Sequence, residues 1–139
     1  MVSTASIELQ TRGHADPHDV TSQVQHHVQS SGVRSGTVTV FTSSSTSAIT
    51  TIEFESGALD DLRRALDEIA PQDREYKHNL RWHDGNGHSH LRAALIGPSL
   101  TIPVLDGQLM LGTWQQILFI DFDVRARSRR LVVQIVGEA

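Results

Sequence analysis

Apolar and polar residues alternate along several stretches of the chain, and this pattern predicts β-strands. In residues 4–12, Ile7 and Leu9 fall on one side and Glu8 and Gln10 on the other, as in a half-buried strand. Four further segments are rich in β-branched or apolar residues and predict strands as well: 37–42, 47–54, 114–123 and 130–136.

Two other segments carry apolar residues at a helical spacing. In the first, Asp16 stands at the N-cap, Pro17 at the first helical position and Gly32 after the last turn. Its apolar stripe consists of Val20, Val24 and Val28. The second helix is predicted to begin after a Ser56 cap and to end before Pro71. Its stripe consists of Leu59, Leu62, Leu66 and Ile69.

The rest of the chain predicts a hairpin and a long polar connection. Asp106-Gly107 suits a type I′ turn between strands at 100–105 and 108–112. Residues 72–89 are polar and show no period, and irregular stretches of this length are usually functional or disordered. A short helix follows over 90–96. Together these elements predict one α+β domain spanning residues 1–139, with two main helices against a largely antiparallel sheet.

Composition narrows the class of protein. The chain has 139 residues, 16 acidic and 12 basic side chains and a net charge of −4, which argues against a nucleic-acid partner. It has no cysteine, which excludes a disulfide scaffold, a thiolate zinc site and a cysteine nucleophile. No apolar run approaches the roughly 20 residues of a membrane span, and the first residues lack a signal-peptide pattern. We therefore expect a soluble, cytoplasmic protein without a membrane partner.

Histidine is the unusual component, with eight residues in the chain and four of them between positions 78 and 90. Neutral imidazole is a common ligand of zinc and similar metals, and Asp or Asn oxygens complete such sites. His88 and His90 are two positions apart, so on an extended segment both side chains would point the same way. Two interpretations stay open: a metal or catalytic site, or a solvated loop whose histidines bind nothing. The earlier histidines are interpreted as solvated or interface residues: His14, His18, His26 and His27.

Other polar residues stand where strands are predicted to end. Glu53 suits a general base or a ligand, or is simply the polar end of a strand. The hydroxyls of Ser44, Ser45 and Thr46 would donate hydrogen bonds to a phosphate, or else cap a turn. Trp114 beside Gln115 suits the floor of a ligand pocket, or core packing. A late basic cluster is either a solvated face or an anion site: Arg125, Arg127, Arg129 and Arg130.

Residues 85–116 resemble the signature of the YjbQ family, also called the secondary thiamine-phosphate synthase family. The stretch reads GNGHSHLRAALIGPSLTIPVLDGQLMLGTWQQ, and the resemblance continues upstream through TSAITTIEFESGALDDL (46–62) and YKHN (76–79). It implies a compact α+β subunit in a homotrimer, with a polar pocket near a subunit boundary. It also implies the joining of a pyrimidine methyl diphosphate to a thiazole phosphate, with release of pyrophosphate.

The resemblance further implies roles for individual residues. The family histidines fall on His78 and His90, the acidic residue on Glu53, and the aromatic-amide pair on Trp114 and Gln115. Where many members carry a first histidine, this chain has Ser44, whose hydroxyl is a poor metal ligand and a poor base. We expect His83 or His88 to substitute for it.

These considerations combine into one predicted site. Glu53, His78 and His90 are the expected catalytic residues, and a divalent ion, zinc or magnesium, is expected near His78, His88 and His90. The expected contacts to a small phosphorylated substrate are Ser44, Thr46, Asn86, Trp114 and Gln115. We expect His78, His88 and His90 to converge with Glu53 and Trp114 nearby, across two subunits. The alternative is a trimeric binding module for a metal ion or small phosphorylated ligand without catalysis, and a third interpretation makes the histidines interface groups.

Overall fold

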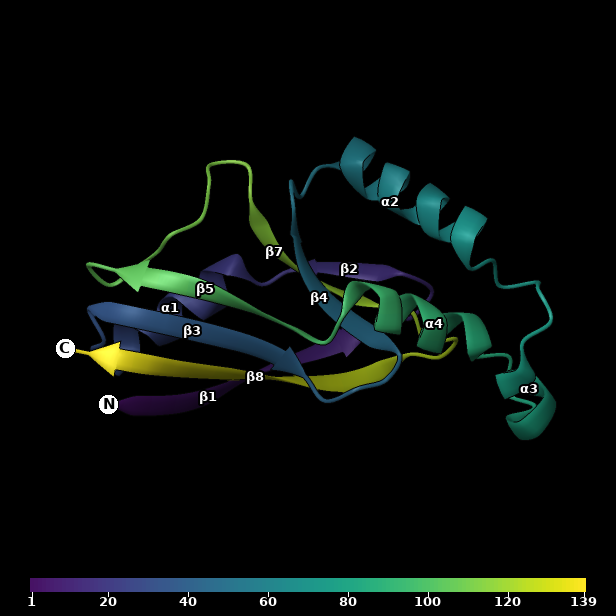
Figure 1. The fold of residues 1–139 in the computed structure, drawn as a ribbon, viewed down its shortest axis with the longest axis horizontal. Coiled ribbons are helices and arrows are strands. Elements are labelled where there is room, and N and C mark those ends of the chain that lie inside the picture. The colour runs from purple at the N-terminus through teal and green to yellow at the C-terminus, as the bar shows by residue number, and fades with distance from the viewer.

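Eight strands form two antiparallel sheets, and four helices lie beside them (Figure 1). The computed structural model describes residues 1–139. The five-stranded sheet has the order β1 (Val2–Thr11), β8 (Arg127–Glu138), β3 (Ser35–Thr42), β5 (Ser99–Leu105) and β6 (Gln108–Leu109). The three-stranded sheet has the order β2 (Asp16–Asp19), β7 (Gln116–Asp121) and β4 (Ser47–Ile52). The helices are α1 (Thr21–Ser31), α2 (Ser56–Ile69), α3 (Lys77–Trp82) and α4 (Gly87–Ile96).

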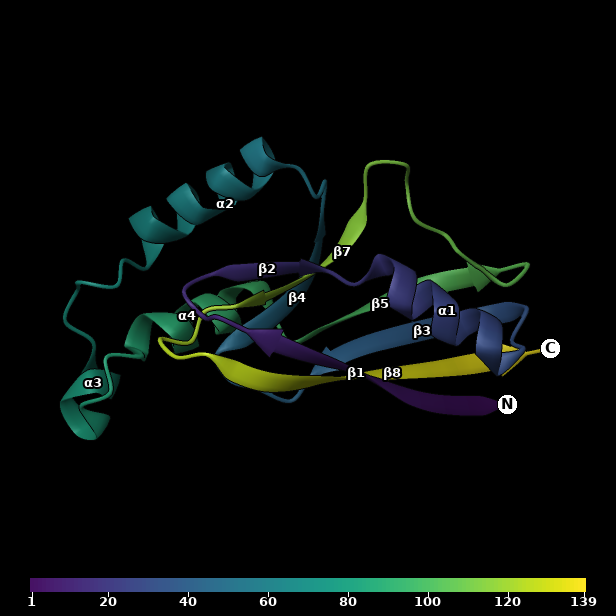
Figure 2. The same ribbon diagram turned by 180° about the vertical axis from the view of Figure 1, so that it is seen from behind.

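The three-stranded sheet is apolar on both faces, and each face belongs to a separate core. Helix α1 lies over the larger sheet and encloses the main core with it (Figure 2). That core includes Ile49 and Phe119 from the smaller sheet. On the other face of the smaller sheet, Leu118 and Ile120 pack with residues of α2 and α4. Burial on both faces explains why β7 reads as a continuous apolar run instead of an alternating one.

The α+β class, the two main helices and the antiparallel sheet are confirmed, but the start of the first helix was predicted wrongly. Asp16 and Pro17 belong to β2, where they pair with Asp121 and Ile120 of β7. Helix α1 begins only at Thr21, whose backbone N–H and hydroxyl both donate to the Asp19 carboxylate. The predicted stripe of α1 is buried as expected, because all three of its valines lie in the main core.

Helix α2 is capped by a different residue from the one expected. The Glu55 carboxylate, and not the Ser56 hydroxyl, accepts hydrogen bonds from the backbone N–H groups of Gly57 and Ala58. The predicted hairpin turn is confirmed, since Asp106 and Gly107 have φ angles of 52° and 73°. Its second strand is shorter than expected, because residues 110–115 form a connection that projects from the sheet (Figure 1).

The stretch 72–89 was predicted to be irregular, and this was wrong. Helix α3 lies within it and α4 begins inside it. The two helices meet at Gly87, whose backbone N–H donates to the side-chain oxygen of Asn79 at 2.8 Å. A Cβ at position 87 would collide with the Tyr76 side chain, so this close approach requires glycine. No helix of the structure is both long enough and apolar enough to cross a lipid bilayer.

Candidate functional site

Helices α3 and α4 bring His78 and His90 together. The centres of the two imidazole rings are 4.2 Å apart and the ring planes are tilted by 38°. Oδ1 of Asp84, in the turn between the helices, lies 3.5 Å from Nδ1 of His78. That nitrogen is buried and makes no hydrogen bond within the protein. The prediction that these two family histidines meet is therefore confirmed, and we call His78, His90 and Asp84 the histidine pair site.

The surroundings of the pair favour an uncharged imidazole. Burial, followed by the charge of His78, lowers the pKa of His90 below its usual value near 6.5, while Asp84 and Asp123 act in the opposite direction. At neutral pH the His90 ring is therefore neutral and has a free lone pair. A neutral imidazole in this position is able to accept a proton or to bind a metal ion.

Buried charged residues next to the site are joined in a network of hydrogen bonds. The Thr46 hydroxyl donates to Oδ2 of Asp123 at 3.0 Å and accepts a hydrogen bond from Arg129 at 2.8 Å. Arg129 also binds both carboxylate oxygens of Asp121, at 2.7 and 3.1 Å. The Thr11 hydroxyl donates to the same Asp121 carboxylate at 2.7 Å. We call these five residues the aspartate network.

Asp123 is ionised at neutral pH despite its burial. Burial by itself raises its pKa, but hydrogen bonds from the backbone of Arg125 and from the side chains of Asn86 and Thr46 more than offset this and lower it. Asn86 also accepts a hydrogen bond from the backbone N–H of Val124 through its side-chain oxygen. Asn86 thus links the start of α4 to the aspartate network.

Two of the hydroxyls predicted to hold a phosphate, those of Ser44 and Thr46, already make hydrogen bonds within the protein. The Ser44 hydroxyl accepts a hydrogen bond from the Thr46 backbone N–H at 3.2 Å and lies 3.3 Å from the Thr46 hydroxyl. Within one chain the turn between β3 and β4 is therefore capped by its own side chains, as the alternative interpretation of this segment expected.

His88 does not join the other two histidines in one chain, so this part of the prediction was wrong. It is buried and lines a separate pocket with residues that include Arg63, Asp67 and Arg92. The prediction assumed an extended segment, but the residues are helical, and two positions on a helix are separated by about 200°. Nowhere in the chain do three or more His, Asp or Glu side chains gather as a metal site.

Glu53, Trp114 and Gln115 lie at the opposite end of the smaller sheet, so the single chain does not bring them to the histidines. Ile52 pairs with Gln116 at that end, whereas Ser47 pairs with Asp121 near the histidines. The two ends are about 17 Å apart at roughly 3.4 Å per residue. Their approach to the histidines across two subunits stays a prediction.

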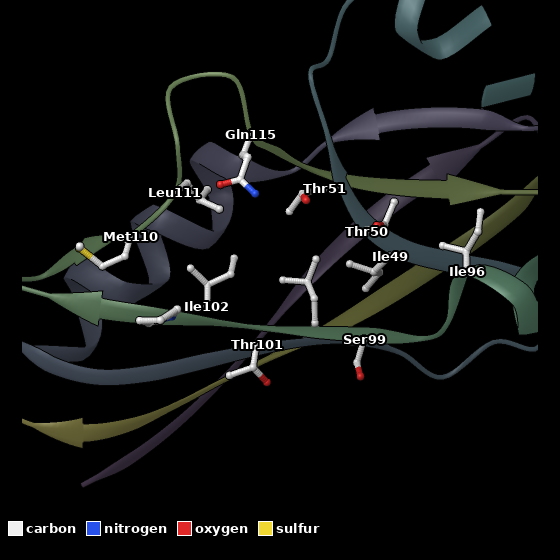
Figure 3. Close-up of a pocket in the computed structure, with 12 residues that line it drawn as sticks. Ile49, Thr50, Thr51, Ile96, Ser99, Thr101, Ile102, Met110, Leu111 and Gln115 are labelled. Carbon is white, nitrogen blue, oxygen red and sulfur yellow. The ribbon is translucent and has the colours of Figure 1, made fainter. Parts of the chain in front are cut away.

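The far end of the smaller sheet has a hollow of its own. Gln115 lies over it, together with Met110 and Leu111, and its floor comes from β4 and β5 (Figure 3). The cavity measures about 350 Å³. Trp114 does not pack in the core, since 71% of it is exposed. Glu53 is exposed as well.

Sequence reasoning did not single out Asp121 and Asp123, which organise the centre of the site. The one available signal was the pair of carboxylates in the otherwise apolar segment 117–124. A charged residue within such a run is rarely buried unless it is paired. The Arg125–Arg130 cluster, interpreted earlier as a solvated face or an anion site, supplies their partners. Arg127 lies 3.2 Å from Asp123, while Arg130 pairs with Glu8 on the surface.

The fold and the site together define a small antiparallel α+β protein with two paired histidines on the helices beside one end of its smaller sheet. The chain belongs to the UPF0047 protein family, YjbQ-like, whose model matches residues 5–138. A UPF0047 protein of Methanothermobacter thermautotrophicus is 42% identical over 99% of this chain and 94% of its own length. The UPF0047 protein YugU of Bacillus subtilis is 29% identical over 95% of this chain and 98% of its own.

Solved structures show the same fold. A YbjQ-like protein of unknown function from Sulfolobus solfataricus has a TM-score of 0.94 and 35% identity, with 99% of each chain covered. A hypothetical protein from Aeropyrum pernix has a TM-score of 0.90 and 34% identity, covering 98% of this chain and 99% of its own.

Proposed function

We propose that the chain is an enzyme acting on small phosphorylated molecules at the histidine pair site, and that it joins a pyrimidine methyl diphosphate to a thiazole phosphate. The observation that carries the proposal is the pairing of two imidazoles from different helices, 4.2 Å apart, beside the carboxylate of Asp84. Histidine pairs oriented by a carboxylate are suited to proton transfer near neutral pH. The choice of this reaction rests on the family resemblance.

In the proposed reaction, the bond between the pyrimidine methylene carbon and the diphosphate oxygen breaks, and the diphosphate leaves with the electron pair. The thiazole nitrogen forms the new bond to the methylene carbon. Neutral His90 would accept a hydrogen bond from the pyrimidine amine, which increases electron density in the ring as the diphosphate leaves. The leaving diphosphate requires a cation. Arg125 suits this role, because Arg127 and Arg129 are occupied by the aspartates.

The residues of one chain do not by themselves fit a divalent ion. Two imidazoles are suitable ligands, and Nδ1 of His78 makes no hydrogen bond within the protein. Zinc sites usually have three or four protein ligands, however, and no third ligand joins the pair within the chain. The proposed reaction therefore does not use a metal ion.

We also propose that the site is completed in a homotrimer. The histidine pair and the Gln115 hollow lie at opposite ends of the smaller sheet. In a ring of three copies, the histidine end of one copy would contact the Gln115 end of the next. Exposed apolar side chains on both parts support this arrangement, because apolar side chains are commonly covered at contacts between subunits: Leu80, Trp82, Leu91 and Leu95 on α3 and α4, and Met110 and Trp114 on the projecting connection. Light scattering should give the mass of three 15.3-kDa chains. A 15.3-kDa particle at micromolar concentration would refute the trimer.

The activity is tested by incubating purified protein with both precursors and measuring thiamine phosphate and pyrophosphate. We expect turnover by the unmodified protein and a loss of about 100-fold or more in His90→Ala and His78→Ala. His26→Ala is the matched control, because His26 is an exposed histidine on α1, away from the site. Absence of turnover, or equal rates in all variants, would contradict the proposal.

The binding module is the second candidate, and it is favoured by Nδ1 of His78, a buried ring nitrogen without a hydrogen bond that lies beside the His90 ring. It predicts that zinc or the thiazole phosphate binds to the unmodified protein without turnover. Metal analysis of protein purified without a histidine tag, followed by calorimetric titration, distinguishes the two functions.

A further inference from the structure

We propose that a second polar pocket, on the other face of α4, binds a small oxyanion with the charge and size of phosphate or sulfate. This pocket lies between α2, α4 and the turn at residues 13–15, and we call it the α2–α4 pocket. Its volume is about 170 Å³, and its lining residues are His14, Ala15, Arg63, Asp67, Gln72, His88 and Arg92. It shares no lining residue with the histidine pair site, so the proposal is independent of the proposed function.

Guanidinium groups outnumber carboxylates in the lining. It holds the side chains of Arg63 and Arg92, two imidazoles and a single carboxylate, that of Asp67. The Arg92 side chain is only 7% exposed and is fixed in place. Its Nε donates to the Ala70 carbonyl and its Nη2 to Asp67, both at 2.9 Å. Its Nη1 makes no hydrogen bond within the protein, so one donor of a rigid guanidinium is left for a ligand.

Arg63 lies on α2 at the opposite wall. Its Nη2 lies 3.4 Å from the Ala15 carbonyl, which is a long hydrogen bond, and its Nη1 contacts Asp60 at 3.1 Å. The side chain is 38% exposed, so it is free to turn toward an ion entering from solvent. An oxyanion between Arg63 and Arg92 would bind guanidinium groups from both helices.

His88 is the deepest polar residue of the pocket. It is 2% exposed, and its Nδ1 is buried without a hydrogen-bond partner. Buried polar atoms are nearly always paired, so an unpaired one requires an explanation such as a bound ion or water. Burial lowers the pKa of His88, and the charges of Arg92 and His14 lower it further, while the Gly85 backbone and the charge of Asp123 act in the opposite direction. A neutral imidazole still has one ring N–H that is able to donate a hydrogen bond to a bound anion.

The third wall is the turn Gly13-His14-Ala15, in which all three residues have positive φ, at 75°, 56° and 62°. This conformation is uncommon for alanine and persists only where the surroundings enforce it. The backbone N–H of His14 donates to the Asp123 carbonyl at 2.8 Å, which fixes the turn. Its position puts the His14 imidazole on the pocket.

The volume sets the class of ligand. About 170 Å³ corresponds to roughly five or six water molecules at 30 Å³ each. It lies below the roughly 300 Å³ at which pockets for drug-sized molecules begin. A free tetrahedral oxyanion fits, and so does the terminal phosphate of a larger molecule that remains outside. The Asp67 carboxylate competes for Arg92, so the expected affinity is in the millimolar range.

Calorimetric titration with sodium sulfate, which does not change charge near neutral pH, tests the proposal. We expect saturable binding to the unmodified protein and a loss of about tenfold or more in Arg63→Gln, as a charge-assisted hydrogen bond would give. Arg64→Gln is the matched control, because Arg64 stands next in the same helix, is 75% exposed and pairs only with Asp61. Arg63 is preferred to the buried Arg92, whose loss would also disturb the packing of α2 on α4.

A second variant and two further readouts test whether the bound ligand is an anion. Asp67→Asn should tighten sulfate binding, because it removes the competing carboxylate, and weaker binding would overturn the assignment to an anion. The His88 ring resonances should shift on titration with sulfate. Absence of saturable binding, or an equal loss in Arg63→Gln and Arg64→Gln, would also overturn the proposal. Inorganic phosphate and a phosphate monoester, titrated separately, distinguish a free ion from the end of a larger ligand.

Discussion

Replacement of Arg129 by methionine tests how far the aspartate network holds the centre of the molecule together. The Asp121 side chain is fully buried and Arg129 is 14% exposed, so Arg129→Met leaves a carboxylate in the interior without its guanidinium. Removing one partner of a buried ion pair costs about 3–5 kcal/mol. Asp121 keeps hydrogen bonds from Thr11 and from the Asp123 backbone, at 2.7 and 3.0 Å. We therefore expect about 3 kcal/mol, at the lower end of that range.

Urea denaturation at one protein concentration provides the assay, since assembly would make stability depend on concentration. A loss of about 3 kcal/mol corresponds to a fall in Tm of roughly 10 °C for a chain of this size. Arg130→Met is the matched control, because Arg130 is the next residue and its partner Glu8 is 69% exposed. Exposed pairs contribute little, so the control should lose less than about 1 kcal/mol.

The double variant Arg129→Met/Asp121→Asn separates the buried charge from the lost packing. It should recover part of the stability, because no unpaired charge remains in the interior. Equal losses in Arg129→Met and Arg130→Met would refute the reasoning, and so would a double variant less stable than Arg129→Met.

Three further predictions concern the site, the pH dependence and the sheet. Asn79→Ala should lower the free energy of unfolding by about 1 kcal/mol and weaken the contact between His78 and His90, because the hydrogen bond to Gly87 is lost. Asn79→Asp is the control, since it keeps the acceptor oxygen. Urea denaturation and the NMR shifts of the histidine rings compare the two variants. The pKa values of His88 and His90 are lowered in the folded chain, so the unfolded chain binds protons first and the free energy of unfolding should fall as pH drops below about 6.5. Urea denaturation at pH 7.5, 6.5 and 5.5 measures this fall, and NMR titration of His90 above pH 6.5 would contradict it. Gly137→Ala should lower the free energy of unfolding by about 2 kcal/mol in the same assay, because a Cβ there would overlap the Ser35 carbonyl on β3. An unchanged midpoint of the urea transition would show that the strands have room to separate.

The sequence predicts the strands well where the chain alternates and one face is buried, as in β1. It predicts the wrong element at Asp16-Pro17, because those residues suit a helix start and a strand edge equally. The choice is made by pairing with β7, about a hundred residues away. Helix α3 was missed for a different reason. Its apolar residues Leu80 and Trp82 are more than half exposed, so no buried face imposes a period on the sequence.

The candidate site was predicted in part for similar reasons. The density of histidines indicated the region, and the family resemblance selected the pair that meets. His88 was misplaced because the direction of its side chain depends on whether α4 has already begun, and the helix was predicted to begin at residue 90, whereas it begins at Gly87. The role of Asp121 depends on Arg129 and Thr11, and Thr11 lies 110 positions away in the sequence. No local pattern reports such a distant partner.

The position of β8 has a consequence for how the chain acquires its fold. β8 lies between β1 and β3, so two strands that are more than a hundred residues apart in the sequence are neighbours in the sheet (Figure 1). During synthesis β1 has no partner until β8 has been made, so the larger sheet closes only after the intervening strands and helices exist. Folds dominated by such distant pairings fold slowly, in milliseconds to seconds. Loss of β1 would remove an outer strand with its contacts to the main core and the aspartate network, whereas loss of β8 would also separate β1 from the rest of the larger sheet. Disruption of β8 should therefore be more damaging than disruption of β1.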